Sequence, residues 1–331
     1  MAITLKDVAQ RAGVSHAAVS RTFTPGASVS ARTRAKVEKA AAELNYSPNI
    51  LARSLMTRKT QLVGLVSNNF HNPVFLEIFD LFTRGLQAQG LRPLLVNLSE
   101  ETDPKRSVGM LQQYSVDGVI VASSHVADGF ALAFQAAGMP VVHAFGRATR
   151  TPVVPVVGID NADAGRIAAR TLIARGYRRI GFLGGPQDAS TTQDRGQGFL
   201  EAAAAAGIDA IASYAGAYSF DAGRDEMARL LAAPWAEAYF CADDVLSIGA
   251  LAAIRKAGLA VPQDIGIIGL NDMALAAWTG IELTTIHQPF AAIVEASIEL
   301  MQSRFSNPGR LPEARLFPCR IVERATLRPL P

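Results

Sequence analysis

The residues with the most distinctive chemistry lie near the start of the chain, in the run VSHAAVSRTF at 14–23. At about 100° per residue, positions 16, 17, 20 and 21 of a helix fall within one arc roughly 140° wide. Arginine can donate two hydrogen bonds to guanine, histidine can form one with a base, and an alanine methyl can pack on thymine. This arc therefore predicts a surface that contacts DNA bases and phosphates, formed by His16, Ala17, Ser20 and Arg21. A solvated helix face without a partner is the alternative.

Two short helices joined by a tight turn would present this surface. Thr4 can cap a first helix that runs to about residue 12, and Ser15 can cap a second helix through about residue 22. Gly13 permits the left-handed backbone of the turn between them. A third helix is expected after Ser30, because apolar residues recur at i, i+3, i+4 and i+7 in the stretch that follows. Three short helices of this kind are typical of a helix-turn-helix head.

The charge distribution favours the same interpretation. Residues 1–60 contain ten Lys or Arg and three Asp or Glu, a net charge of +7, so the other 271 residues carry −4 of the total of +3. A basic head on a mildly acidic body is typical of a nucleic-acid-binding module joined to a regulatory domain.

Composition limits the remaining possibilities. The 331 residues suffice for two or three domains, and 49% of them are hydrophobic. The two cysteines, Cys241 and Cys319, lie far apart and predict neither a disulfide framework nor a zinc site. The sequence has no export signal at its start and no apolar run long enough to span a membrane. We therefore expect a cytoplasmic protein that uses no metal and no cofactor.

The segment at 47–60 predicts a short helix after the head. Ser47 can cap it, and Pro48 is suited to the first helical position. A helix that ends near Met56 is too short to be stable alone in water. Leu51 and Leu55 lie four residues apart among basic residues, a pattern that suits insertion into a DNA minor groove. An amphipathic linker packed on the body is the alternative.

From residue 61 onward short apolar runs alternate with helical segments. The runs are QLVGLVS, RPLLVNL, DGVIVA, MPVVHAF, RRIGFLG, EAYFCA and DIGIIGL, and the first is followed by a helix expected at about 73–89. Alternation over about 260 residues predicts two doubly wound parallel sheets with helical crossovers.

Polar side chains follow several of these strands, at the sheet edge where open parallel sheets bind ligands. They are Asn68, Asn69 and His71 after the first strand, residues 187–195 after RRIGFLGG, Asp243 and Asp244 after AYFCA, and Asn271 and Asp272 after GIIGL. Converging on one cleft, they would bind a hydroxyl-rich molecule by several directed hydrogen bonds. Taken singly, each is more typical of an ordinary solvated loop.

The first 60 residues, TLKDVAQRAGVSHAAVSRTF…VSARTRAKVEKAAAELNYSPNILARSL, resemble the DNA-binding head and hinge helix of the lactose-repressor and purine-repressor (LacI/GalR) family. The resemblance implies a homodimer on a pseudo-palindromic operator, with one Leu55 of each subunit in the minor groove. His16 and Ala17 occupy the variable base-reading pair, so the operator sequence does not carry over from relatives. The implied DNA-binding residues are Thr4, Ser15, His16, Ala17, Ser20, Arg21, Asn49, Ala52 and Leu55.

The resemblance continues through LTTIHQP and IVERATLRP and implies a periplasmic-binding-protein-like body. We expect a head at 1–46, a hinge at 47–60 and a body at 61–331. Its first subdomain would comprise about 61–159 and 289–315, and its second about 160–288 and 316–331. A small effector would bind between them, at Asn69, Val74, Phe75, Thr191, Arg195, Tyr218, Asp243 and Asn271.

Two departures from the family pattern bear on the effector. Ala189 replaces an arginine of the purine repressor, and Asn271 replaces an aspartate of many members, which argues against a purine. The remaining polar set suits a sugar, polyol or sugar acid, with Arg195 able to pair with a carboxylate. The chain ends without a heptad helix of the kind that makes some relatives tetramers, which favours a dimer.

We therefore expect an effector-controlled transcription regulator, and a repressor in particular. A solute-binding protein is the second hypothesis, against which the basic head argues. An enzyme acting on sugars or nucleosides is the third, with Asp243, Asp244, His143 and His287 as acid–base candidates. No nucleophile–base motif, phosphate-binding loop or metal-ligand spacing accompanies them.

Overall fold

The computed structural model describes residues 3–24, 26–47, 59–68, 70–98, 103–123 and 128–331. The chain divides into two compact units, residues 1–60 and residues 61–331. In the described part of the chain, no helix is both long and apolar enough to cross a bilayer.

The described residues of the smaller unit, 3–24 and 26–47, contain the three helices of the head: α1 (Leu5–Ala12), α2 (His16–Thr22) and α3 (Ala31–Glu43). At α1, the Thr4 backbone N–H and hydroxyl both donate to the Asp7 carboxylate, which lowers the pKa of that carboxyl. Ser15 caps α2 by accepting the Ala18 N–H at 3.2 Å. Gly13 makes the turn between α1 and α2 at φ +64°. The three predicted helices and their capping residues are therefore confirmed.

A small core holds the head together. Its fully buried members come from all three helices: Val8, Ala9, Val19, Val37, Ala40 and Ala41. Leu44, Tyr46 and Phe23 pack at its edge, and the last two bring their rings within 6.0 Å. Since Val19 is buried, the opposite face of α2 is free to be solvent-exposed.

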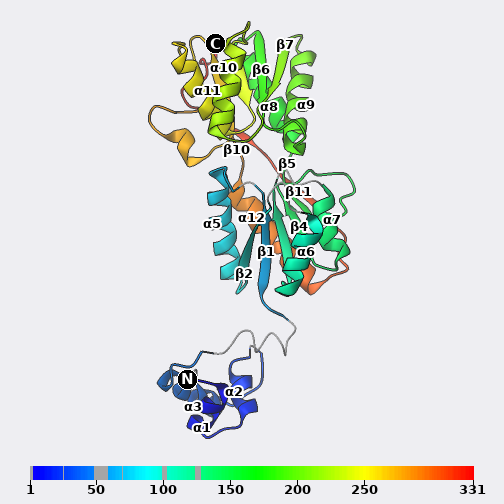
Figure 1. Ribbon diagram of the computed structural model, residues 1–331, viewed down its shortest axis with the longest axis vertical. Coiled ribbons are helices and arrows are strands. Elements are labelled where there is room, and N and C mark those ends of the chain that lie inside the picture. The colour runs from blue at the N-terminus through cyan, green and yellow to red at the C-terminus, as the bar shows by residue number, and fades with distance from the viewer. Residues whose placement is uncertain (1–2, 25, 48–58, 69, 99–102, 124–127) are drawn as a thin grey trace. The chain divides into compact units, whose positions relative to one another are not determined.

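The larger unit, the body, contains two six-stranded sheets, which Figure 1 shows one beyond the other along the body. All neighbouring strands of the first sheet are parallel, in the order β11-β5-β4-β3-β1-β2. These strands are β1 (Leu62–Ser67), β2 (Arg92–Asn97), β3 (Gly118–Ala122), β4 (Val141–Ala144), β5 (Val156–Ile159) and β11 (Ala314–Phe317). Its helices are α5 (Val74–Ala88), α6 (Pro104–Gln113), α7 (Asp128–Ala136) and α12 (Phe290–Ser306).

The second sheet has the order β12-β10-β9-β8-β6-β7 and is parallel except for β12, which pairs antiparallel with β10. Its strands are β6 (Arg179–Gly184), β7 (Asp209–Tyr214), β8 (Ala238–Cys241), β9 (Gly266–Asn271), β10 (Thr285–His287) and β12 (Arg320–Val322). Its helices are α8 (Asn161–Ala174), α9 (Ser190–Ala205), α10 (Phe220–Leu231), α11 (Asp244–Lys256) and the short 3-10 helix η1 (Ala274–Ala277).

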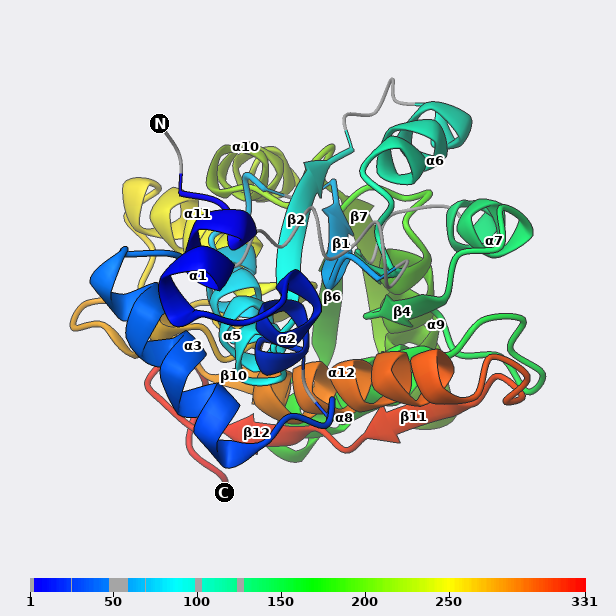
Figure 2. The same ribbon diagram turned by 90° about the horizontal axis from the view of Figure 1, so that it is seen from below.

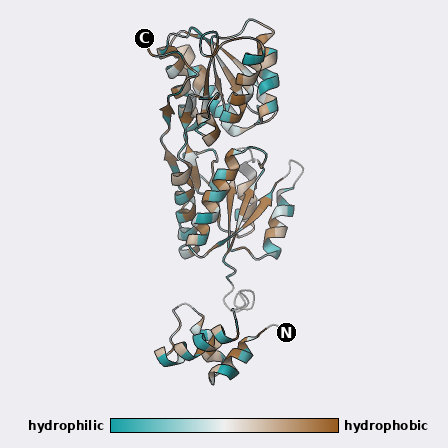
Figure 3. Cartoon of the chain, turned by 90° about the vertical axis from the view of Figure 1, so that its left-hand side faces the viewer, coloured by the Kyte–Doolittle hydropathy of each residue, from teal (hydrophilic) through white to brown (hydrophobic). Residues whose placement is uncertain are grey.

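Each sheet is covered by helices on both faces. In the first subdomain α6 and α7 lie together on one face and α12 packs with α5 on the other (Figure 2). In the second, α8 packs on α9 and α10 packs on α11. Figure 3 shows hydrophobic strands enclosed by helices whose outer faces are hydrophilic. The chain thus has the expected helical head and the expected pair of doubly wound α/β subdomains.

The chain crosses between the two subdomains three times: after β5, after β10 and between β11 and β12. The strand β11 runs to Phe317 within the first sheet, so the third crossing follows that residue. The carboxyl ends of the parallel strands are the ends at which open sheets bind ligands. In both sheets these ends face the region that the three connecting segments border.

The seven apolar runs of the sequence form β1, β2, β3, β4, β6, β8 and β9, and the helix expected at about 73–89 is α5. Five strands were not predicted. The strand β7 is an edge strand with a single buried residue and no alternation of exposure, and β5, β10, β11 and β12 are only three or four residues long. Such short segments have no periodicity to distinguish them from loops.

The contact between α8 and α9 depends on two glycines. A Cβ on Gly198 would lie 1.9 Å from the Ala162 carbonyl oxygen, and one on Gly165 would lie 2.1 Å from the Arg195 carbonyl oxygen. Because both obstacles are backbone atoms, a side chain at either position forces the helices apart.

We expect Gly198→Ala to lower the free energy of unfolding by about 3 kcal/mol, the upper part of the usual range for overpacking. Gly109→Ala is the matched control, since Gly109 also lies within a helix but has open space at its Cβ. The control should gain up to about 1 kcal/mol from helix propensity. Urea unfolding measures both, and equal stability of the two variants would contradict the close contact.

Candidate functional site

A cavity lies between the facing edges of the two sheets of the body. Residues from both subdomains line it: Asn72, Val74, Phe75, Ile78, Phe145, Ile159, Asn161, Arg195, Tyr218, Asp243, Asn271, Gln288 and Phe290. Its walls combine one arginine, one aspartate and four side-chain amides with four aromatic rings. Such a lining can form many directed hydrogen bonds around a small molecule and cover its apolar faces.

Arg195 on α9 is 93% buried and is oriented by neutral partners. Its Nε donates to the Asn161 Oδ1 at 2.8 Å, and its Nη1 donates to the Ala242 carbonyl oxygen at 2.8 Å. A buried guanidinium has five N–H groups, so the remaining ones can reach a molecule in the cavity. Because neither hydrogen-bond partner is charged, the arginine keeps its attraction for electron-rich oxygens of a ligand.

Asp243 is held from both subdomains. It caps α11 by accepting the Leu246 N–H at 2.8 Å, and its other oxygen accepts the Asn72 amide across the cavity at 2.6 Å. Burial raises the pKa of the Asp243 carboxyl, and these hydrogen bonds and the charge of Arg195 oppose that rise. The Asn72 amide is itself oriented by the Val74 N–H, which donates to its Oδ1 at 3.1 Å.

Two further lining residues come from strand ends and loops. Asn271 ends β9 with a left-handed backbone, φ +126°. Tyr218 packs its ring against Gly185 and shares a 2.6 Å hydrogen bond with the Thr192 hydroxyl. Tyr218 therefore offers the cavity mainly a ring face, since its hydroxyl already has a partner.

Six of the eight expected effector residues line this cavity: Val74, Phe75, Arg195, Tyr218, Asp243 and Asn271. Thr191 does not line it. It is 98% buried at the start of α9, and its hydroxyl has no hydrogen-bond partner among the described residues. Asn69 lies outside the described residues.

Sequence reasoning missed three polar lining residues. Asn72 lies two residues before Val74, which the family resemblance named, and Gln288 lies within LTTIHQP, so a signal existed for both. Asn161 follows β5, which was not predicted as a strand. The rings of Phe145 and Phe290, 6.0 Å apart edge-on, were also missed because apolar residues in such runs are usually core.

A second contact joins the subdomains outside this cavity. Arg147, just after β4, donates two hydrogen bonds to the Asp194 carboxylate of α9, at 3.0 and 2.7 Å. It also donates to the Ser190 carbonyl oxygen at 3.0 Å. A bidentate arginine–carboxylate pair is a specific contact, and this one fixes the first turn of the helix that carries Arg195.

Asp244, next to Asp243, lies behind the cavity and is completely buried. Burial is the main cause that raises the pKa of its carboxyl to about 7, and the neighbouring carboxylates add to the rise. The Thr285 hydroxyl and the Met273 N–H donate to it at 2.5 and 2.8 Å and oppose the shift. Its carboxyl therefore changes charge near neutral pH, inside the protein.

This shift predicts a pH dependence of stability. The folded-state pKa lies above the ordinary value of 3.8, so the folded state favours the protonated form. The stability that this raised pKa contributes is fully present below about pH 4 and is lost as the pH rises through about 7. Asp244→Asn should remove this slope between pH 5 and 8, because the amide can accept the Met273 N–H while donating to the Thr285 hydroxyl. Thermal unfolding across this range measures it, and an unchanged slope would contradict the assignment.

In the head, the predicted base-reading residues lie on one side of α2. His16, Ala17 and Arg21 are exposed, Ser20 is half-buried, and the Arg21 Nε donates to the Ala17 carbonyl oxygen at 3.3 Å. Thr4 and Ser15 are exposed at the starts of α1 and α2. Asn49, Ala52 and Leu55 lie outside the described residues.

In the described part of the chain, no cluster of three or more His, Cys, Asp or Glu residues could hold a metal ion. His143 and Asp243, two of the possible acid–base residues, are occupied in hydrogen bonds to Ser123 and to Asn72. The geometry is that of a binding cavity.

Comparison with known proteins decides the family. A model described as "Bacterial regulatory proteins, lacI family" matches residues 4–49, and one for a periplasmic binding protein-like domain matches residues 169–327. The HTH-type transcriptional regulator CelR of Thermobifida fusca is 34% identical over 314 residues, 92% of each chain. The HTH-type transcriptional repressor PurR of Proteus mirabilis is 34% identical over 331 aligned residues, 98% of this chain and 96% of its own. The chain belongs to the lacI family.

Solved structures of the lacI family share the fold over nearly the full length. The lac repressor dimer bound to operator and the anti-inducer ONPF superposes with a TM-score of 0.88 at 27% identity, covering 98% of this chain and 99% of that one. The CelR–cellobiose complex superposes with a TM-score of 0.74 at 32% identity, covering 98% and 99%. This lacI-family chain is accordingly a DNA-binding transcription regulator with an effector-binding domain, and not an enzyme.

Proposed function

We propose that this lacI-family regulator is a repressor that binds a pseudo-palindromic operator as a homodimer. Its DNA affinity would be controlled by a small hydroxylated effector, a sugar, polyol or sugar acid, bound in the cavity of the body. Effector binding would change the relative placement of the two subdomains, and this change would alter DNA affinity.

The composition of the cavity wall carries the proposal for the effector. Its amides, Asn72, Asn161, Asn271 and Gln288, are all at least 93% buried, and each can both donate and accept. Hydroxyl groups also both donate and accept, so an amide-rich wall matches a polyhydroxylated molecule. The charges of Arg195 and Asp243 balance, which favours a neutral sugar or polyol over a sugar acid.

Relatives support a sugar and a dimer. CelR, whose solved complex contains cellobiose, is 32% identical to this chain over nearly its full length. The lac repressor, 27% identical, was solved as a dimer bound to operator. In this chain the exposed apolar side chains Leu76 on α5, Leu95 on β2 and Trp278 after η1 provide surface that a second subunit would bury. The helix α5 and the segment after β9 lie on the same side of the body in Figure 1.

The base-reading proposal rests on the exposed face of α2. His16, Ala17 and Arg21 would meet the bases of the major groove, with Thr4, Ser15 and Ser20 at the backbone. Asn49, Ala52 and Leu55 remain proposed contacts of the hinge segment in the minor groove.

Thermal unfolding with a panel of candidate effectors tests the proposal for the cavity. The panel should contain cellobiose, glucose, ribose, sorbitol, gluconate and glucuronate. A compound present at about 100 times its Kd would stabilise the protein by about 2.7 kcal/mol, a rise of several degrees in Tm. We expect neutral members to give the largest rise. If only gluconate and glucuronate raise the Tm, the cavity binds anions. If a broader panel of sugars gives no rise in Tm, the proposal of a sugar effector is contradicted.

Selection of DNA from a random library by the purified protein tests the other half of the proposal. A two-fold symmetric consensus is expected, because two heads related by symmetry contact two half-sites. An asymmetric consensus would contradict the paired-head arrangement.

A further inference from the structure

The turn that follows β9 has an unusual backbone. Asn271 has φ +126° and Asp272 has φ +59°, both in the left-handed region that non-glycine residues rarely adopt. Asn271 lines the cavity, and Asp272 does not. Strained residues of this kind persist only where their surroundings hold them in place. The contacts of this turn therefore show what holds Asn271 toward the cavity.

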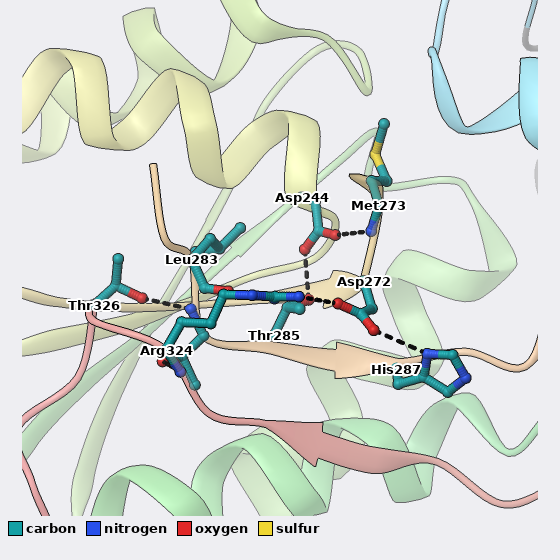
Figure 4. Close-up of polar contacts among 9 residues, drawn as sticks. Asp244, Asp272, Met273, Leu283, Thr285, His287, Arg324 and Thr326 are labelled. Carbon is teal, nitrogen blue, oxygen red and sulfur yellow. Dashed lines mark hydrogen bonds and ion pairs between the residues drawn. The ribbon is translucent and has the colours of Figure 1, made fainter. Parts of the chain in front are cut away.

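Two carboxylates hold the turn (Figure 4). The Asp272 carboxylate accepts the Arg324 Nη2 at 2.6 Å and pairs with the His287 Nδ1 at 3.0 Å. On the next residue, the Met273 N–H donates to the Asp244 carboxylate at 2.8 Å. The side chain of Asp272 is only 16% exposed, so its pairing with arginine is shielded from solvent.

The partners of Asp272 lie in the second subdomain, close in sequence to two of the segments that connect the subdomains. His287 is the last residue of β10, and the chain then passes through residues 288–289 into α12 of the first subdomain. Arg324 follows β12, the strand by which the chain re-enters the second subdomain after β11. Arg324 is itself fixed, because it donates to the Leu283 carbonyl oxygen at 2.8 Å. One carboxylate thus joins the cavity turn to two of the three connections.

The first subdomain also contributes a charge near this pair. Glu77 on α5 has a raised pKa, caused first by partial burial and then by the Asp272 carboxylate, with His287 lowering it. Asp80 on the same helix raises it further. The Asp272–His287 pair therefore acts electrostatically on a helix of the opposite subdomain.

We propose that Asp272 is a positioning residue that holds Asn271 toward the cavity and couples it to two connecting segments. The importance of this coupling for regulation rests on the proposed effector site, although the coupling itself can be measured without an effector. A contact made or lost at Asn271 would be transmitted through Asp272 to the segments that set the placement of the subdomains.

Hydrogen exchange of the full-length protein, without ligand, tests the coupling. In Asp272→Asn we expect exchange to rise about tenfold or more in peptides covering 271–276, 284–290 and 318–324, since a charge-assisted hydrogen bond is lost. Peptides from α8 and α9 should not change. Asp264→Asn is the matched control, because that carboxylate accepts the Ala260 N–H at 2.7 Å in the loop between α11 and β9 and does not contact His287 or Arg324.

A second variant separates coupling from local strain. Asp272→Gly adopts the left-handed turn freely, so it removes the carboxylate without straining the backbone. The proposal requires exchange at 284–290 and 318–324 to rise as in Asp272→Asn. Wild-type exchange in these two segments would overturn it, as would an increase spread evenly over the second subdomain. A crystal structure of Asp272→Asn with the Asn271 side chain still in place would overturn the positioning role.

The result of the hydrogen-exchange experiment does not depend on whether any compound of the effector panel binds. Failure of every sugar to stabilise the protein would contradict the proposed effector class and leave the exchange result unaffected. Loss of the exchange effect would contradict the coupling even if a sugar binds.

Discussion

Arg195→Met is expected to weaken binding of the effector by at least about 100-fold, while the operator affinity of the effector-free protein stays within about twofold. Two hydrogen bonds from a charged donor contribute about 1.5–3 kcal/mol each, which corresponds to this loss. Methionine keeps much of the length and packing of the arginine stem, so the change acts mainly on the charge and its hydrogen bonds. Calorimetric titration with the sugar identified by thermal unfolding measures it.

A control separates recognition from general damage to the second subdomain. Arg166→Met removes an arginine from α8 that pairs with Asp160 and Asp163 and does not line the cavity. Its effector affinity should remain near that of the wild type. If Arg195→Met binds equally well, or if both variants lose affinity together, Arg195 does not contact the effector.

Arg21→Ala is expected to reduce operator affinity by roughly 30-fold or more. A good bidentate contact to guanine is worth about 1–3 kcal/mol, and a dimer loses it at both half-sites. The same variant should tolerate any base pair at one position of each half-site. Fluorescence anisotropy at fixed salt, with the selected operator and its single-base variants, measures both effects.

Lys39→Ala provides a charge-matched comparison in the same head. Lys39 is exposed on α3 and lies outside the predicted base-reading arc. Its loss should weaken binding slightly and equally for all sequences, since only the phosphate attraction changes. Unchanged selectivity in Arg21→Ala would move the base-reading role to another face.

The head could be predicted almost completely from its sequence because its determinants are local. The caps at Thr4 and Ser15 and the turn at Gly13 act within a few residues of themselves. Apolar spacing then fixed the core residues Val19 and Val37.

The cavity was less accessible to sequence reasoning, because it depends on contacts between residues far apart in the chain. The Asn72–Asp243 hydrogen bond joins positions 171 residues apart, and Arg147 and Asp194 are separated by 47. Asn161 follows β5, a strand of four residues that no local pattern reveals. Arg195 and Asp243 were found because the family resemblance named them, whereas Asn161 was missed because only the folded sheet brings it to the cavity.

The core of the head has a consequence for how such regulators diversify. Every described residue of that core lies between positions 5 and 46, within the head itself. A change of His16 or Ala17 alters an exposed surface and leaves this core untouched. Specificity for the operator and specificity for the effector can therefore change separately during evolution. A chimaera that carries this head on the body of another regulator should keep the operator specificity of this head.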